Sequence, residues 1–253
     1  MQHNRIALIT GANQGVGFQV AKELAANGVT VLVGSRNLKR GQDAAKEIGS
    51  NAIPIQIDVT DRASIARAAE YVRKEFGRLD LLINNAAISN IAQQQLGLSL
   101  LEYAELCHPS VASLDEMRSV WETNVFGALA VYQAMLPLLR EGKNARIVIV
   151  SSSLGSLGRN ADPTCYHRGF YSPVYAMSKT ALSALGLSIM IELEQTDIKV
   201  NLVSPGFTST NLNLFEGLES LEDGSREVVR VALFGSEDPS GTFTEWENQP
   251  IPW

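Results

Sequence analysis

Short, nearly continuous apolar runs alternate along the chain with longer stretches in which apolar positions recur every three or four residues. Apolar runs are typical of strands covered on both faces of a parallel sheet, whereas the longer pattern predicts amphipathic helices. Strands are predicted at 5–10, 29–35, 52–58, 79–85, 145–152 and 198–205, with a candidate last edge strand at 241–246. Helices are predicted at roughly 15–27, 38–48, 61–76, 114–140 and 174–194.

The strand–helix alternation predicts an α/β fold with a doubly wound parallel sheet and helices on both faces. The sequence contains no linker, internal repeat or low-complexity segment, so we expect a single domain over residues 1–253. Two connections, near 88–113 and 155–172, are longer than a compact domain usually needs. Long loops of this sort are usually functional or disordered.

Composition and charge argue against several classes of protein. The chain is 45% hydrophobic and 19% charged, which is ordinary for a soluble protein with a sizeable core. A formal net charge of −6 argues against nucleic acid or an anionic membrane as the main partner. The apolar run around 128–139 is too short to span a bilayer, and the N-terminus has no signal-peptide pattern. We therefore expect a soluble cytoplasmic protein.

The cysteines and histidines do not indicate a disulfide framework or a metal site. Cys107 and Cys165 are the only cysteines, and they fit a reducing compartment. Neither they nor the three histidines, His3, His108 and His167, have the spacing of metal ligands. No bound metal is expected.

A glycine-rich turn, "TGANQGVG" at 10–17, follows the first predicted strand and precedes the first helix. Gly11, Gly15 and Gly17 would allow a tight turn and a close approach of the backbone to a pyrophosphate at the helix N-terminus. The spacing is G-x-x-x-G-x-G, and no Gly-Lys-Ser/Thr follows to suggest a P-loop. A dinucleotide fits the alternating pattern better than a mononucleotide.

The end of the second strand indicates which dinucleotide is bound. NAD-binding proteins often place a carboxylate here to accept from the ribose 2′-hydroxyl. This chain instead has "VGSRN" at 33–37, with Arg36 suited to a phosphate. The alternative is a solvated arginine at a helix start, but we favour NADPH over NADH.

Tyr175 and Lys179 are four residues apart in "YAMSK", so they would share one face of a helix. A phenol has a pKa near about 10, and a neighbouring cation favours the phenolate and lowers that pKa. A lowered pKa would suit the tyrosine for proton transfer. A surface pair on a helix is the alternative, although Tyr175 alone among six tyrosines has a lysine at this spacing.

Five motifs in order, "TGANQGVG", "NNAA" (84–87), "SSSLG" (151–155), "YAMSK" and "PGFTST" (205–210), make the chain resemble the short-chain dehydrogenase/reductase family. The resemblance runs from Arg5 to about Thr210 and implies a Rossmann-type fold with a nicotinamide cofactor. It also implies four catalytic residues, with Ser151 and Ser153 as rivals for the serine: Asn124, Ser152, Tyr175 and Lys179.

In that family's chemistry, Tyr175 would donate a proton to the substrate oxygen and Ser152 would hold that oxygen. Hydride addition builds negative charge there, and aimed donors stabilise it. Lys179 would lower the tyrosine pKa and bond the nicotinamide ribose. Asn124 would support a water chain that resupplies protons; its alternative is an asparagine that bonds the backbone.

The resemblance implies further contacts with the cofactor. Asp58 and Val59 would meet adenine, although Asp58 could instead be a turn or cap residue. The family usually has glycine where this chain has Ala87, and Thr208 and Thr210 could bind the carboxamide or cap the next helix. The expected cofactor-binding residues are Gly11, Asn13, Gln14, Gly15, Val16, Gly17, Arg36, Asp58, Val59, Asn85, Ala86, Tyr175, Lys179, Pro205, Gly206, Thr208 and Thr210.

The chain departs from the common family pattern at its two long connections. Ser152 and Tyr175 are 23 residues apart, and the extra segment carries Tyr166, Phe170 and Tyr171. Somewhat similar insertions occur in monomeric carbonyl reductases of the family. Residues 180–193 are apolar nearly all round, which would fit either a partner helix or a covering loop. Monomer and homo-oligomer both remain open.

These observations predict an NADPH-dependent oxidoreductase that reduces a ketone or aldehyde, with Tyr175 as proton donor. The partner is a small carbonyl or alcohol substrate. An NAD-dependent alcohol dehydrogenase is the alternative among enzymes. A catalytically silent NADPH-binding sensor is the alternative outside them.

Overall fold

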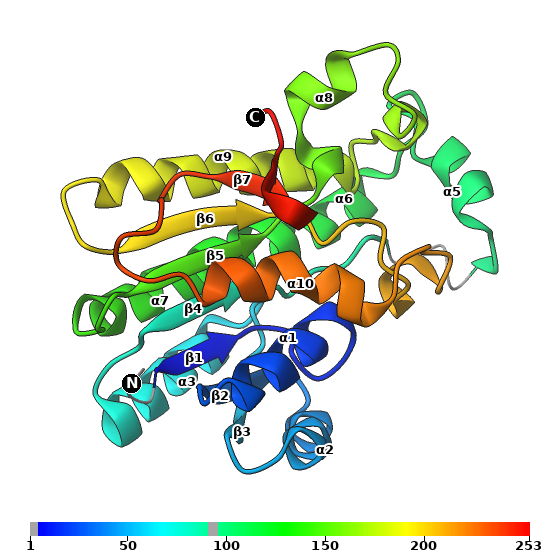
Figure 1. Cartoon of the computed structure of the whole chain (residues 1–253). Coiled ribbons are helices and arrows are strands. Elements are labelled where there is room, and N and C mark those ends of the chain that lie inside the picture. The colour runs from blue at the N-terminus through cyan, green and yellow to red at the C-terminus, as the bar shows by residue number, and fades with distance from the viewer. Residues whose placement is uncertain (1–4, 91–95) are drawn as a thin grey trace.

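The computed structural model describes residues 5–90 and 96–253. Within them, one sheet has the strand order β3-β2-β1-β4-β5-β6-β7-β8, and every neighbouring pair is parallel except β7 and β8 (Figure 1). The strands are β1 Ile6–Ile9, β2 Thr30–Ser35, β3 Ala52–Gln56, β4 Leu81–Asn84, β5 Arg146–Val150, β6 Lys199–Val203, β7 Phe243–Glu245 and β8 Gln249–Pro250. The predicted doubly wound α/β fold is confirmed.

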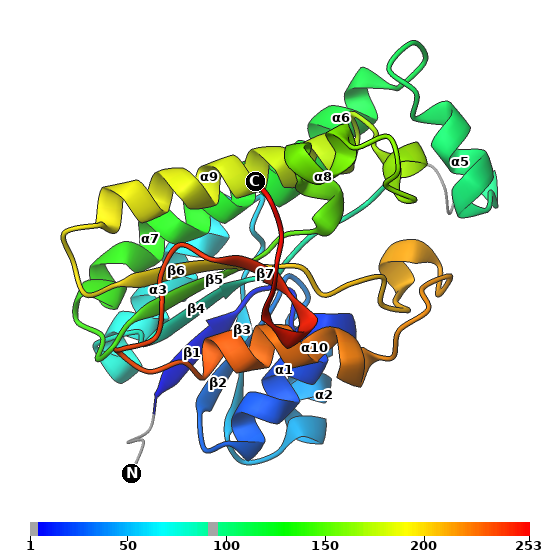
Figure 2. The same ribbon diagram turned by 45° about the horizontal axis from the view of Figure 1, so that its top comes forward.

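Six helices cover the two faces of the sheet (Figure 2). Successive strand residues point to opposite faces, so Leu8 packs into one core layer and Ile9 into the other. One layer is covered by α3 (Arg62–Phe76), α7 (Ala128–Arg140) and α9 (Ala176–Leu193), and the other by α1 (Gly15–Ala26), α2 (Leu38–Ile48) and α10 (Leu221–Ala232). Because both faces are buried, the central strands are mainly apolar.

The predicted helix at 114–140 is wrong in its middle. The structure has α6 (Leu114–Trp121), a π-helical turn (Glu122–Gly127) and then α7. A Cβ on Gly127 would lie 2.9 Å from the Val59 carbonyl oxygen, so the chain passes very close to the segment after β3. Single π-helical turns inside helices are rare and frequently occur at functional sites.

Both long connections contain helices. The first includes α5 (Leu100–Leu106), with part of the predicted loop lying outside the described residues. The second includes α8 (Leu157–Ala161) and 3₁₀ turns at Ser153–Gly155 and Arg168–Phe170. The candidate edge strand is found as β7, but β8 and not β7 forms the edge of the sheet. The chain after Glu245 turns back through the 3₁₀ turn Trp246–Asn248.

Among the described residues, α9 is the one helix long and apolar enough to span a membrane by length and composition alone. Its sheet-facing side, including Leu182 and Ile189, is buried in the core. On the opposite side Ala184, Ser188 and Ile191 are exposed, so no described loop covers that side.

Candidate active site

Two adjoining cavities lie at the carboxyl ends of the parallel strands. The smaller, of about 240 Å³, is bordered by the glycine-rich turn and the segments that follow β2, β3 and β4. The larger, of about 970 Å³, is bordered by the long connections and the segment after β6. Tyr175, Val16, Ser151, Pro205, Thr210 and Leu212 line both cavities. Open α/β sheets bind ligands at this edge.

The glycine-rich turn requires its glycines. Gly11 and Gly15 have φ values of 67° and 61°, which favour glycine. A Cβ on Gly17 would lie 2.3 Å from Asn85 Nδ2 and 2.8 Å from the Gly11 carbonyl oxygen. In the described structure the Gln14 side chain does not cap α1, so backbone N–H groups at this N-terminus remain available to an anion.

Thr10, which the sequence analysis missed, holds the turn against the end of β4. Its hydroxyl accepts from the N–H groups of Asn85 and Ala86, both at 3.0 Å. Asn85 Nδ2 donates in return to the carbonyl oxygens of Thr10 (2.8 Å) and Gly11 (3.2 Å). The predicted cofactor residue Asn85 therefore shapes the cavity wall. A buried threonine at the end of a strand was the available signal, because such a hydroxyl needs a partner.

The segments after β2 and β3 supply the charged end of the smaller cavity. Arg36 and Arg40 both line it and are exposed. Asn13 Oδ1 accepts from the Ser35 hydroxyl at 3.2 Å, which ties the glycine turn to the end of β2. Asp58 Oδ1 accepts from the N–H and hydroxyl of Thr60 at 2.9 and 2.7 Å, so Asp58 forms a turn as well as lining the cavity.

Tyr175 and Lys179 stand at the N-terminus of α9, one turn apart. Lys179 is 2% exposed, and its ammonium donates to the Val150 carbonyl oxygen at 2.9 Å. The Lys179 Nζ atom is 5.8 Å from the centre of the Tyr175 ring. The pair is therefore not a solvated surface pair, and Lys179 holds it against the carboxyl end of β5.

Burial controls both pKa values. Desolvation raises the pKa of Tyr175 to about 12, and a hydrogen bond with the Ser152 side chain acts against this increase. Desolvation lowers the pKa of Lys179 to about 8. Lys179 does not lower the pKa of Tyr175 in this arrangement, because loss of hydration dominates for both groups.

The three adjacent serines have different partners. Ser151 is buried, and its hydroxyl contacts the Ser183 hydroxyl at 2.8 Å and the Lys179 carbonyl oxygen. Ser153 anchors the turn through its N–H, which donates to the Ser204 hydroxyl at 3.0 Å. Ser152 lies beside Tyr175, where its side chain acts to lower the pKa of the phenol, and its hydroxyl accepts from the Leu154 N–H at 3.2 Å. This geometry favours Ser152 over its two rivals.

Asn124 lies in the π-helical turn and its amide is occupied by protein groups. Its Nδ2 donates to the Ile88 carbonyl oxygen (2.9 Å) and to the Ser178 hydroxyl (3.0 Å), and its Oδ1 accepts from the Ile88 N–H (2.9 Å). The backbone-bonding alternative is therefore present, and Asn124 joins the segment after β4 to the start of α9. Ser178, one turn beyond Tyr175, was not predicted.

The segment after β6 carries the remaining predicted residues. Pro205 and Thr210 line both cavities, and Gly206 and Thr208 line the larger one. The Thr208 hydroxyl donates to the Pro205 carbonyl oxygen at 2.7 Å, and Thr210 caps the 3₁₀ turn Asn211–Asn213. The capping alternative is therefore correct for Thr210.

Aromatic and apolar side chains dominate the wall of the larger cavity. They come from α5, from the insertion before Tyr175 and from the segment after β6: Tyr103, Tyr166, Phe170, Tyr171, Phe207 and Leu218. The sequence analysis anticipated the three from the insertion but missed Tyr103 and Phe207. Within residues 5–90 and 96–253, no group of three His, Cys, Asp or Glu side chains could hold a metal.

Comparison with known proteins identifies the family. The sequence pattern described as short chain dehydrogenase matches residues 5–217. The chain belongs to the short-chain dehydrogenase/reductase family. Short-chain dehydrogenase anuI of Penicillium roqueforti is 37% identical over 253 residues, covering 96% of this chain and 94% of that protein. The (+)-neomenthol dehydrogenase of Arabidopsis thaliana is 30% identical, covering 94% of this chain and 95% of that protein.

A solved structure of the family supports the same assignment. NADPH-bound carbonyl reductase from chicken fatty liver superposes with a TM-score of 0.79 at 26% identity, covering 99% of this chain and 94% of that one. This short-chain dehydrogenase/reductase is therefore an oxidoreductase that acts on carbonyl or alcohol substrates, and its homologues use nicotinamide nucleotides.

Proposed function

We propose that this short-chain dehydrogenase/reductase is an NADPH-dependent reductase of bulky, apolar ketones or aldehydes, with Tyr175 as the proton donor. The observation that carries the proposal is the position of Tyr175, which lines both cavities beside Ser152. A group on the wall between the cavity that holds the glycine turn and the larger, mainly apolar cavity can reach a carbonyl presented to the cofactor.

The residues of the smaller cavity fit NADPH. Backbone N–H groups at the N-terminus of α1 would hold the pyrophosphate, since Gly11 and Gly15 turn the chain there without a side chain. Arg36 would pair with the 2′-phosphate, and no acidic residue follows β2 to accept from a free 2′-hydroxyl. Lys179, at the base of the cavity, would bond the nicotinamide ribose.

The bound cofactor supplies the hydride, and this chain's residues handle the oxygen and its proton. With a pKa of about 12, Tyr175 keeps its proton at neutral pH and can deliver it to the oxygen of the forming alcohol. The Ser152 hydroxyl, beside that phenol, would hold the same oxygen. The tyrosine then recovers a proton from solvent. Lys179 can assist, since its lowered pKa lets it exchange a proton near neutral pH.

The larger cavity indicates the class of substrate. Its volume of about 970 Å³ is at the upper end of the roughly 300–1,000 Å³ typical of small-molecule sites, and several aromatic side chains line its walls. Residues 155–172 form one wall, so we propose that this insertion controls which ketones reach Tyr175. Shortening it should change relative activity across ketones more than it changes NADPH affinity.

The proposal is tested by measuring oxidation of NADPH and of NADH with a panel of linear, cyclic and fused-ring ketones. Neomenthol, the alcohol named in the Arabidopsis relative, is assayed in the oxidative direction. Activity with NADPH and larger cyclic ketones is expected. Equal use of NADH would favour the NAD-dependent alcohol dehydrogenase. Tight NADPH binding without turnover of any substrate would favour the silent sensor.

A further inference from the structure

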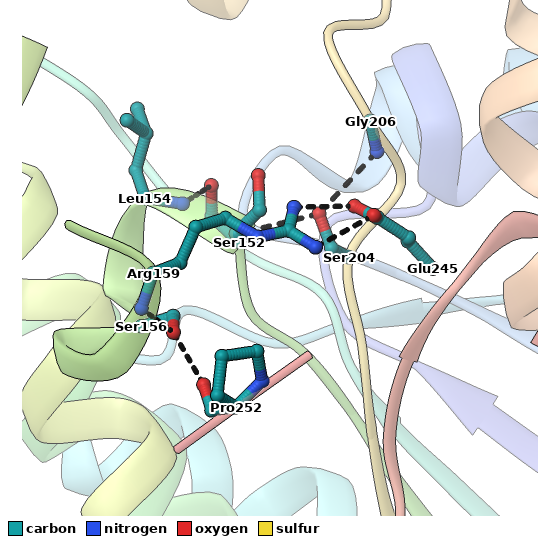
Figure 3. Close-up of polar contacts among 9 residues, drawn as sticks. Ser152, Leu154, Ser156, Arg159, Ser204, Gly206, Glu245 and Pro252 are labelled. Carbon is teal, nitrogen blue, oxygen red and sulfur yellow. Dashed lines mark hydrogen bonds and ion pairs between the residues drawn. The ribbon is translucent and has the colours of Figure 1, made fainter. Parts of the chain in front are cut away.

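The C-terminal segment, residues 243–253, returns to the substrate side of the molecule and contacts the insertion (Figure 3). The Ser156 hydroxyl donates to the Pro252 carbonyl oxygen, and the Gly158 N–H donates to the Trp253 carbonyl oxygen at 3.0 Å. A Cβ on Gly158 would lie 3.0 Å from Pro252 Cβ, so the two backbones are closely packed. We call residues 243–253 the C-terminal strap.

An ion pair joins the same two segments. Arg159 of α8 donates to Glu245 of β7 through both terminal nitrogens, at 2.9 and 2.8 Å. The side chains are only 26% and 29% exposed, unlike a solvated surface pair. Figure 3 shows them extended toward one another from the insertion and the strap. Two-pronged arginine–carboxylate bonds fix geometry as well as adding energy.

Both members of this pair line the larger cavity, together with Ser152, Gly158 and Pro252. The hydrogen bond between Arg159 and Glu245 raises the pKa of the guanidinium, so the pair stays charged and mutually satisfied. A substrate therefore meets a fixed polar wall there, with no unbalanced charge from these two groups.

The rest of the insertion has few other attachments. Among the described residues, the hydrogen bonds recorded for 162–170 all stay within 159–171. At its far end, the Tyr171 hydroxyl contacts the Thr180 hydroxyl at 3.2 Å. The stretch that contains Tyr166 and Phe170, both at the wall of the cavity, is thus held mainly at its two ends, and the Arg159 end depends on the strap.

We propose that Arg159 and Glu245 are specificity-determining residues, whose ion pair fixes the insertion against the C-terminal strap and so sets the size of the substrate cavity. Glu245 is a positioning residue, because it acts on the insertion and not on the reacting oxygen. The inference rests on the proposed reductase function for its kinetic consequence, but the physical link between strap and insertion does not.

The test uses the full-length protein with Glu245→Gln and with the charge-exchanged double variant Arg159→Glu/Glu245→Arg. Hydrogen exchange at 162–170, measured without substrate, should be about tenfold faster in Glu245→Gln, as expected when a charged hydrogen-bonding partner is lost. The KM for 2-decalone should rise by about tenfold, while kcat and the NADPH dissociation constant stay within about twofold. The KM for cyclohexanone should rise less, because this smaller ketone contacts less of the cavity wall. In the double variant, both the exchange rate at 162–170 and the KM for 2-decalone should return most of the way to the wild-type values.

The control is Glu70→Gln, which breaks an ion pair with Arg73 on α3, away from the strap and the insertion. It should leave exchange at 162–170 and both KM values unchanged. If Glu245→Gln unfolds, removal of Pro252 and Trp253 tests the same link through the Ser156 and Gly158 contacts. Exchange and KM values equal to those of the control would overturn the proposal. If wild type reduces no ketone, the reductase function fails, and the exchange experiment still decides whether the strap holds the insertion.

Discussion

The smaller cavity is bordered mainly by short segments that directly follow β1, β2, β3 and β4, whereas the larger cavity is assembled from parts of the chain that lie far apart. On the first side, the sheet itself brings the residues together, because parallel strands end at one edge. On the second side, α5, the insertion and the C-terminal strap are brought together by contacts between distant segments, through both backbone and side chains. The same fold thus contains a wall fixed by backbone geometry and a wall fixed by tertiary contacts.

This difference explains how the two sides can change. A Cβ at Gly17 collides with Asn85, so the cofactor side tolerates little variation. The substrate side has open positions, such as Gly169, where a Cβ would meet nothing within 4 Å. Substrate preference can therefore change there without disturbing the cofactor site. Tyr175 lines both cavities, so it belongs to the cofactor side and to the substrate side.

The largest effect should come from a substitution of Tyr175, the residue that the two sides share. Tyr175→Phe removes only the hydroxyl that is proposed to deliver the proton, so kcat should fall by about 10²–10⁴-fold. NADPH binding, measured by fluorescence titration, should remain within about twofold because the ring is retained. Substantial ketone reduction by this variant would remove Tyr175 from the role of proton donor.

The second prediction concerns the stability of the buried Lys179. Its folded pKa of about 8 lies below the ordinary 10.5, so the unfolded chain binds more protons between these values, and stability should rise with pH there. Between pH 7 and pH 9.5, wild type should gain about 2 kcal/mol relative to Lys179→Met. Tyr175 acts in the opposite direction only above its ordinary pKa of 10.0, where stability falls as pH rises.

Urea unfolding of the cofactor-free protein at the two pH values measures this difference. Lys46→Met, an exposed lysine on α2, is the control and should show no such change relative to wild type. A pH-independent difference between wild type and Lys179→Met would mean that burial does not shift this ammonium.

The third prediction tests the charged end of the smaller cavity. Arg36→Asp should lower the ratio of kcat/KM for NADPH over NADH by about tenfold to a hundredfold, because it removes a charged bond to the 2′-phosphate and adds repulsion. Arg40→Asp, one turn along α2, should have a weaker effect. If wild type uses NADH as well as NADPH, or if Arg36→Asp keeps the NADPH preference, Arg36 is a solvated side chain.

The sequence predicts the cofactor side of the molecule better than the substrate side. The strand positions and the glycine turn follow from local patterns, and Arg36 could be placed because it directly follows a strand. The pairing of Arg159 with Glu245 spans 86 residues and has no local signature. The π-helical turn at Asn124 was missed because it accompanies a contact between distant segments, the approach of Gly127 to Val59.

The smallest predicted effect compares one glycine from each side. Gly17→Ala places a Cβ 2.3 Å from Asn85 Nδ2, and the bonds from Asn85 to Thr10 and Gly11 prevent an easy shift. Forcing an atom into such a site typically costs about 1–3 kcal/mol. Gly169→Ala meets open space, so its effect should lie within about 0.5 kcal/mol. Both are measured as free energies of unfolding in urea, with NADPH affinity determined in parallel.

Gly17→Ala should also weaken NADPH binding, because the displaced Asn85 moves the turn that faces the pyrophosphate. Gly169→Ala should leave NADPH binding unchanged and alter only the relative activity across ketones. Equal stability losses for the two variants would show that the insertion is as tightly packed as the glycine turn. The two cavity walls would then not differ in packing, contrary to what their contacts indicate.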